Sequence, residues 1–250
     1  MNKKNIIILI LSIISCQLTA QNIEEDRILI PMISANLGYN HPGGDFAERF
    51  NGSGQVGAAF KLKFKSNLFV GLEGNYLFSQ GIKDPEYRDY LENEDGWITN
   101  FYGEPGILAE KLDGFVIAAN LGYIIPVLNP NPNSGIMISG GIGFMQHKIW
   151  IEERQNNIPQ LSDEYIKGYD RLCNGLMTNQ FIGYMFFQKK AVWNFYAGLE
   201  FTQGFTQNRR SWDFIEKRKI DEKRLDLLYS IKVGWVISLH KRMATEIYYY

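Results

Sequence analysis

The feature of this 250-residue sequence that most restricts its fold is an alternation of oily and polar side chains, clearest in AVWNFYAGLEFTQGF at 191–205. Trp193, Phe195 and Phe201 fall on one parity, and Asn194 and Glu200 fall on the other. Successive side chains of a strand point to opposite faces, so the segment predicts a strand with one oily and one polar face. The oily face is the core of a soluble sandwich, but the lipid-facing wall of a membrane barrel.

The same alternation recurs along the chain and predicts an all-β protein. We expect strands at 28–40, 54–64, 68–80, 114–127, 135–151, 175–188, 191–205 and 224–239. Eight antiparallel up-and-down strands are enough to close a small barrel whose interior is filled by side chains. Two segments leave ten strands as an alternative, because 81–113 is long for a loop and the tail 242–250 would add a ninth strand to an even count.

The predicted connections alternate between short and long. Short ones lie near 65–67, 129–135, 188–190 and 240–242, and long ones at about 41–53, 81–113, 152–174 and 206–223. Short periplasmic turns and long extracellular loops are typical of outer-membrane barrels. Within the first long connection, HPGGDFAERFNGSG at 41–54 is interpreted as a flexible loop, because its glycines lack the strand-turn-helix context of a phosphate site.

The length of the oily faces favours lipid over a soluble core. Trp193 and Phe205 share a face twelve positions apart, which spans roughly 30 Å in a tilted strand, comparable to the hydrocarbon core of a bilayer. We therefore expect a transmembrane barrel in contact with outer-membrane lipid. A secreted, lipocalin-like soluble binder is the alternative.

The N-terminus predicts an export signal. MNKKN is basic, IIILILSIIS is apolar, and LTA precedes Gln21, so we expect a signal peptide at 1–20 and a barrel domain at 21–250. Lipid attachment at Cys16 is the alternative processing route. After cleavage before Gln21 only Cys173 remains, so no internal disulfide or cysteine metal cluster is expected.

Composition narrows the function classes. The formal charge of −1 gives no general attraction to nucleic acid. Charged residues at 21% and hydrophobic ones at 45% exclude a bundle of membrane-spanning helices, although not a barrel. No spacing of metal ligands stands out, so we expect neither a metal nor a cofactor.

The polar parity supplies the first candidate site. Eight residues are predicted to face the lumen: Lys61, Lys63, Glu73, Asn75, Asn120, Glu200, Asp226 and Lys232. They are either a conducting pore or a paired network that plugs the barrel. Isolated charges are costly in a confined lumen and eight strands leave little bore, so we favour the plug.

The long loops supply the second candidate site. Aromatic and arginine side chains are enriched at binding surfaces, and the candidates are Tyr165, Tyr169, Asp170, Arg171, Arg209, Arg210 and Trp212. Solvated loops packed over the barrel mouth are the alternative. A third candidate, His147 in QHKIWIEE, would serve a membrane-embedded lipid hydrolase only with a nucleophile and an orienting acid beside it. A hydrogen-bonded structural histidine is favoured, and no enzyme is expected.

The signal ending at Ala20-Gln21, the glycine-rich alternating strands and the aromatic C-terminus ending in Tyr250 resemble the small outer-membrane β-barrel proteins of the Bacteroidota. The resemblance implies an accessory role in envelope secretion machinery. We expect a monomeric scaffold that presents extracellular loops to a protein or surface ligand, with a narrow channel for small solutes as the alternative.

Overall fold

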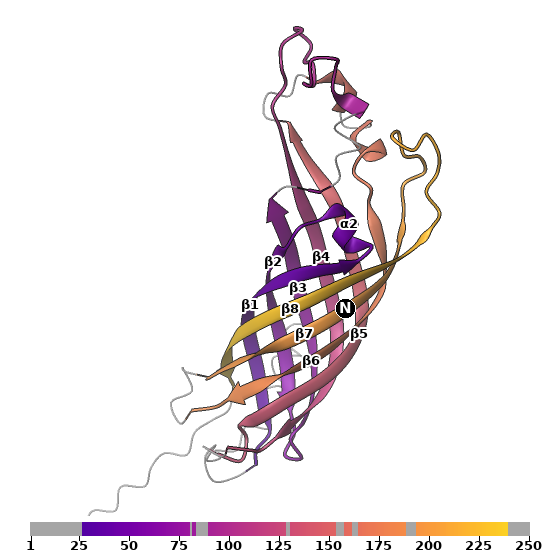
Figure 1. Ribbon diagram of the computed structural model, residues 1–250. Coiled ribbons are helices and arrows are strands. Elements are labelled where there is room, and N and C mark those ends of the chain that lie inside the picture. The colour runs from indigo at the N-terminus through magenta and orange to yellow at the C-terminus, as the bar shows by residue number, and fades with distance from the viewer. Residues whose placement is uncertain are drawn as a thin grey trace, which may run out of the picture.

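The chain folds into a closed β-barrel of eight strands, each antiparallel to the next, with the eighth strand paired to the first (Figure 1). The computed structural model describes residues 27–80, 82–83, 90–128, 131–153, 158–161, 165–188 and 194–239. The strands are β1 (Ile30–Gly44), β2 (Ser53–Lys63), β3 (Leu68–Gln80), β4 (Leu108–Ile125), β5 (Gly135–Glu153), β6 (Cys173–Phe186), β7 (Asn194–Asn208) and β8 (Lys223–Ser238). The short helices are α2 (Phe46–Arg49), η1 (Pro159–Leu161) and η2 (Tyr165–Gly168). The expectation of an eight-stranded, up-and-down barrel is confirmed.

The strand pairing fixes the stagger of the barrel. From Met32 the paired positions run through Lys61, Gly71, Asn120, Gly141, Asn179, Thr202 and Leu228 to Pro42. The path thus returns to β1 ten residues above its start. A ten-residue stagger over eight strands tilts the strands by about 40° to the barrel axis, within the range that closed barrels adopt.

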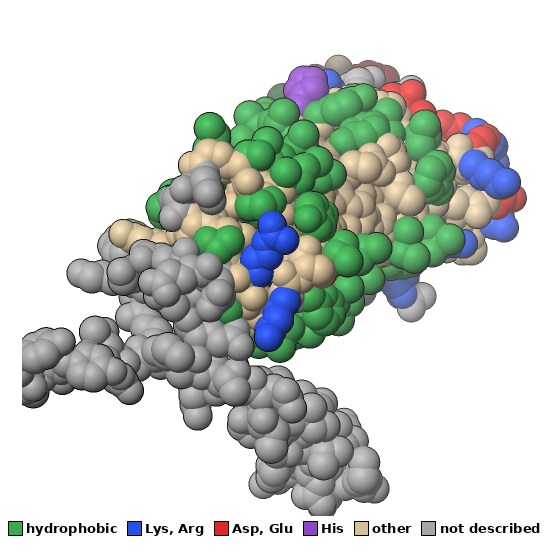
Figure 2. Space-filling model, turned by 90° about the horizontal axis from the view of Figure 1, so that it is seen from below, with side chains coloured by type: hydrophobic (Ala, Val, Ile, Leu, Met, Phe, Trp, Pro, Cys, Tyr) green, Lys and Arg blue, Asp and Glu red, His purple; other side chains and the backbone are tan. Residues whose placement is uncertain are grey.

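The wall has oily side chains outside and polar ones inside. On β8, Tyr229, Ile231 and Val233 are about half exposed, whereas Ser230 and Lys232 between them are buried. Figure 2 shows broad apolar areas over the flank, with the visible acidic side chains gathered at one end. This polarity is the reverse of a soluble barrel's and is that of a transmembrane barrel, so the soluble, lipocalin-like alternative is wrong.

The height of the oily wall matches a membrane. Phe195 and Phe205 both face outward on β7, ten positions apart, which is about 25 Å along the axis at this tilt. That is the height of the apolar band of outer-membrane barrels. Among the residues described, no helix has the length and hydropathy needed to cross a membrane.

Several predicted bounds need correction. In the segment 81–113, β4 starts at Leu108 and pairs with the far end of β5, so the loop is shorter than predicted. The described part of that segment adds no further strand to the ring, and ten strands is wrong. The long connections sit at one end of the barrel, uppermost in Figure 1, which we name the loop end. The signal peptide 1–20, Cys16, Trp193 and the tail 242–250 lie outside the described residues.

The interpretation of 41–54 as a flexible loop is also wrong. HPGG continues β1, because Gly43 and Gly44 pair with Leu227 and Asp226 of the long strand β8. The next residues form α2, and its Phe46 and the following Phe50 are completely buried in the mouth of the barrel. The segment therefore forms part of the interior packing.

The interior has three layers. An apolar cluster that includes Phe46, Phe50 and Met145 fills the loop end. A second apolar cluster, which includes Phe69 and Tyr196, fills the short-turn end. Between them lies a layer of charged and amide side chains that belongs to the first candidate site.

Candidate functional site

The centre of the lumen holds a compact network of charges. Lys232 on β8 lies between two carboxylates, with its Nζ 2.5 Å from Glu73 Oε1 and 2.6 Å from Glu200 Oε2. Lys61 Nζ is 3.9 Å from Glu73 Oε2. All four side chains are almost completely buried. The chain folds this way because each residue has the inward parity of its strand and the stagger brings β2, β3, β7 and β8 to one level.

Amide side chains complete this central network. Asn75 Nδ2 donates to Glu73 Oε1 at 2.9 Å, and Asn36 Nδ2 donates to the same oxygen at 3.4 Å. Asn179 Nδ2 donates to Glu200 Oε1 at 3.0 Å. Sequence reasoning missed Asn36 and Asn179, whose strands alternate less cleanly, although both have inward parity.

The central network leaves almost no open space. The cavity among its side chains, which Asn120 also lines, measures about 10 Å³. A single water molecule needs about that much room. This cavity has room for one water molecule at most, so the geometry at this level is that of a closed lumen.

Two of the eight predicted lumen residues lie outside the central network. Lys63 is at the short-turn end, where its Nζ donates to Asn133 Oδ1 at 2.8 Å and to two backbone carbonyls. Asp226 is at the loop end, where it accepts hydrogen bonds from Thr206, Arg224 and His147. The predicted set therefore occupies three separate levels, because parity alone does not give height along the axis.

His147 is sealed inside the loop end. Its Nε2 lies 2.8 Å from Asp226 Oδ2, and its ring packs edge-on against Phe46 and Phe50, at centroid distances of 5.0 and 5.6 Å. The ring is 0% exposed. The hydroxyl beside it, that of Thr206, is hydrogen-bonded to the same carboxylate oxygen. A lipid substrate cannot reach this imidazole, so the geometry does not support a hydrolase.

Three of the seven predicted loop residues are buried. Tyr169, Asp170 and Arg171, which follow η2, are all nearly inaccessible. Arg210 makes a two-pronged ion pair with Asp170, and this hydrogen bonding raises the pKa of Arg210. Arg171 Nε lies 3.3 Å from Asp213 Oδ2. These residues tie the β5–β6 connection to the β7–β8 connection, so they hold the loops together instead of forming a contact surface.

The remaining loop candidates are accessible. Tyr165 and Trp212 are about half exposed. Arg209 is exposed too, with its Nε donating to Asn174 Oδ1 at 2.6 Å. Sequence reasoning missed the most exposed aromatic pair of the described loops, Phe101 and Tyr102, each 76% exposed in the β3–β4 connection. The signal that could have found them is ITNFYGEPG, two aromatics between turn-forming residues.

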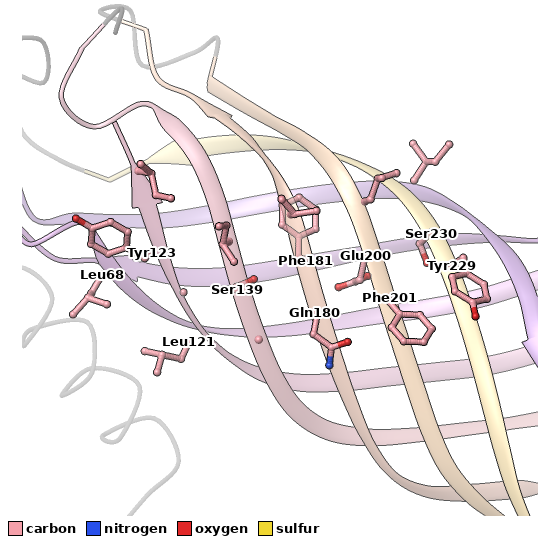
Figure 3. A pocket seen from close by; sticks show the side chains of 17 residues that line it. Leu68, Leu121, Tyr123, Ser139, Gln180, Phe181, Glu200, Phe201, Tyr229 and Ser230 are labelled. Atoms are coloured by element: carbon pink, nitrogen blue, oxygen red, sulfur yellow. The ribbon is translucent and has the colours of Figure 1, made fainter. Parts of the chain in front are cut away.

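A large groove lies on the outer wall rather than in the lumen. Its volume is about 960 Å³, and most of its lining side chains face outward, among them Leu121, Phe201 and Tyr229 (Figure 3). Gly140 has no side chain to fill the space between Leu121 and Gln180, its register neighbours. The groove lies in the apolar band of the wall, which faces acyl chains in a membrane. The described residues hold no grouping of three or more His, Cys, Asp or Glu side chains with the geometry of a metal site.

Comparison with known proteins finds similar solved structures only. No protein-family model and no curated protein sequence matches the chain. Among solved structures, Ail, the attachment invasion locus protein of Yersinia pestis in complex with the heparin analogue sucrose octasulfate, is similar with a TM-score of 0.44 and 9% identity over 84% of this chain and 99% of that one. The outer-membrane protein OprG from Pseudomonas aeruginosa is similar with a TM-score of 0.40 and 12% identity over 87% and 99% of the two chains.

Neisserial surface protein A is similar with a TM-score of 0.42 and 8% identity over 83% of this chain and 96% of its own. These three are small outer-membrane barrels, and their likeness to this chain concerns the fold. The strand pairing and the inverted polarity of the wall establish the barrel independently of them.

Proposed function

We propose that this chain is an outer-membrane β-barrel that acts as a binding scaffold, with its loop end presented outside the cell, and that it does not conduct solutes. The observation that carries the proposal is the closed lumen. A charged layer with a cavity of about 10 Å³ spans the middle, and an apolar cluster blocks each end. What such a barrel offers to its surroundings is its outer wall and its loops.

The loop end has the properties of a contact surface on a rigid base. The base is the set of buried ion pairs that join two connections, including Arg210 with Asp170. Above it, exposed aromatics such as Phe101, Tyr102 and Trp212 lack apolar cover. Aromatic side chains on a preorganised surface contribute most of the binding energy in protein interfaces. A protein or a surface ligand is the partner class that this arrangement fits.

Planar-bilayer recording separates the scaffold from the channel. We expect no conductance for the wild-type barrel or for Phe50→Ala. The Phe50→Ala substitution opens only the apolar cluster at the loop end, and the charged layer below that cluster stays intact. Stepwise conductance of the wild-type protein, altered by Glu73→Gln, would replace the scaffold with the channel.

The binding role is tested at the loop end on whole cells. A photo-crosslinking residue placed at position 102 should capture a defined partner, and Phe101→Ser should abolish the product. The matched control is the same residue at position 65, in the exposed short turn at the opposite end. Products at both positions, or none at 102, contradict a loop-end binding site.

Kinship with Bacteroidota barrels and an accessory role in envelope secretion belong to the same proposal. The resemblance carried by the signal and the aromatic C-terminus supports them. Deleting the gene and measuring secreted cargo tests the secretion role, and unchanged secretion excludes it without affecting the barrel.

A further inference from the structure

A pocket of about 490 Å³ opens at the loop end, between α2 and the β7–β8 connection. Three arginines from three different elements reach it: Arg49 from α2, Arg171 after η2, and Arg224 at the start of β8. Arg49 and Arg171 are 6% and 7% exposed, and the Arg224 side chain is 9% exposed. Guanidinium groups stay charged in proteins, so their burial together requires negative charge nearby.

Among the residues that the structure describes, two of the three arginines have a carboxylate partner. Arg171 pairs with Asp213, and Arg224 pairs with Asp226. For Arg49 the described chain offers only the Cys173 thiol, 3.3 Å from Nη1, and a thiol is a weak acceptor. Burial and the charges of Arg224 and Arg171 lower the pKa of Arg49.

The donors of this cluster are also incompletely used. Arg224 Nη2 donates to the Asp45 carbonyl and to Asp226 Oδ1. Its Nε is buried and has no hydrogen-bond acceptor among the described residues. A buried donor without an acceptor costs on the order of 1–3 kcal/mol, a cost that an external acceptor removes.

The carboxylates at the rim are mostly engaged elsewhere. Glu216 and Glu222 both pair with Arg218, at 3.4 and 2.7 Å. Asp45 Oδ2 accepts the backbone N–H of Leu225 at 2.6 Å. Glu48 is exposed at the rim. An anion would therefore be stabilised most in the inner part of the pocket, beside Arg49 and Arg224.

We propose that this pocket binds a tetrahedral oxyanion, a phosphate or sulfate ester group, through Arg49 and Arg224. Guanidinium forks bind such oxygens with paired, charge-assisted hydrogen bonds. Lys223 adds positive charge at the rim. The proposal deepens the binding role inferred above, because it names the ligand chemistry of one part of the loop end.

The height of the pocket suits a group at the membrane surface. Arg224 directly precedes Leu225, the first outward apolar residue of β8. The pocket thus lies just above the oily band, at the level of lipid headgroups and of glycans close to the membrane. Both sources carry the same ester chemistry.

The test measures thermal unfolding of the folded barrel in nanodiscs with added inorganic phosphate, at constant ionic strength set with chloride. We expect a dose-dependent rise of the unfolding midpoint for the wild type. The control Lys219→Gln removes the same charge from an exposed lysine paired with Asp221, and it should behave as the wild type does. Arg49→Met should lose the response, with an apparent phosphate affinity at least tenfold weaker. An equal response in Arg49→Met, or no response in the wild type, overturns the proposal.

Two more arms complete the design. Arg49→Lys keeps the charge without the guanidinium fork, and we expect it to have an intermediate phosphate affinity. This variant replaces Arg49→Met if Arg49→Met does not fold, which is checked by the migration of unheated protein on gels. Nanodiscs with bisphosphorylated lipid A, compared with the dephosphorylated lipid, test a headgroup, and a soluble sugar phosphate tests a free ligand. If either probe raises the unfolding midpoint and Arg49→Lys weakens that rise, the result supports the site and identifies the source of its ligand. A shift that no arginine variant changes refutes it. Conductance and crosslinking at position 102 do not involve this pocket, so the two proposals fail independently.

Discussion

Replacing Lys232 by Met tests whether the central charge layer holds the barrel together. The Lys232 ammonium lies within 2.6 Å of both Glu73 and Glu200, and apolar clusters separate this layer from water on both sides. Methionine keeps most of the stem but removes the charge. Two carboxylates then face each other, and the nearest remaining cation is Lys61, 3.9 Å from Glu73.

The size of the expected loss in stability follows from the carboxylate charge that Lys232→Met leaves uncompensated. Removing one partner of a buried pair costs about 3–5 kcal/mol, because the other charge stays desolvated. We therefore expect Lys232→Met to lower the free energy of unfolding by about 3–5 kcal/mol. In the double variant Glu200→Gln with Lys232→Met, Lys61 and Glu73 balance each other. The double variant should recover most of the loss, with a coupling energy of about 2 kcal/mol or more.

The assay is urea unfolding of the barrel in phospholipid vesicles, followed by tryptophan fluorescence and by migration of unheated protein on gels. The urea midpoint should fall with the slope unchanged, which identifies a change in stability and not in the extent of unfolding. Lys65→Met, in the exposed turn, should stay within about 0.5 kcal/mol of the wild type. If Lys232→Met costs less than about 1 kcal/mol, or if the double variant equals the sum of the single ones, the layer does not act as a coupled network.

Three further predictions use the same unfolding assay. A Cβ at Gly234 would lie 2.2 Å from a buried tyrosine ring, so Gly234→Ala should cost about 1–3 kcal/mol, whereas outward Gly140, whose nearest atom is 3.8 Å away, should accept Ala at almost no cost. Gln180 and Gln203 exchange hydrogen bonds on the outer wall, so either Leu variant alone should destabilise by about 1 kcal/mol, and both together should be neutral or stabilising in lipid. Phe50→Ala should cost about 3–5 kcal/mol and expose the loop end to protease, which limited proteolysis measures.

The alternation of apolar and polar side chains predicts most of this fold, because the side chains of a strand between lipid and lumen point to the two environments in turn. It predicts the bounds of the strands to within four residues, except the start of β4, and it assigns Lys61, Glu73 and Lys232 to the interior. It could not show that Lys232 meets Glu73, since the two are 159 residues apart and their contact depends on barrel closure and stagger. Height along the axis is likewise a property of the assembled register.

Two segments whose composition resembles that of loops are the hardest to predict. The glycine, aspartate and asparagine of 41–54 favour a loop. Phe46 and Phe50 favour a helix, because a spacing of four places both on one helical face. For Tyr169 and Arg171 the sequence allows either an exposed binding surface or loops that pack on each other over the barrel mouth. Both residues are buried because two long connections pack on each other through rings such as Tyr169 and Phe214, 5.3 Å apart.

The charged layer also bears on how the chain reaches a single register. A slip of one residue between neighbouring strands would turn every inward side chain of one strand outward. For β8 that slip moves Lys232 into lipid and Trp235 into the lumen, and a charge at the bilayer centre costs several kcal/mol. An apolar interior would carry no such penalty, because either face of the strand could then meet lipid. The buried charges therefore need not add net stability to be useful: they destabilise the misregistered barrels more than the native one.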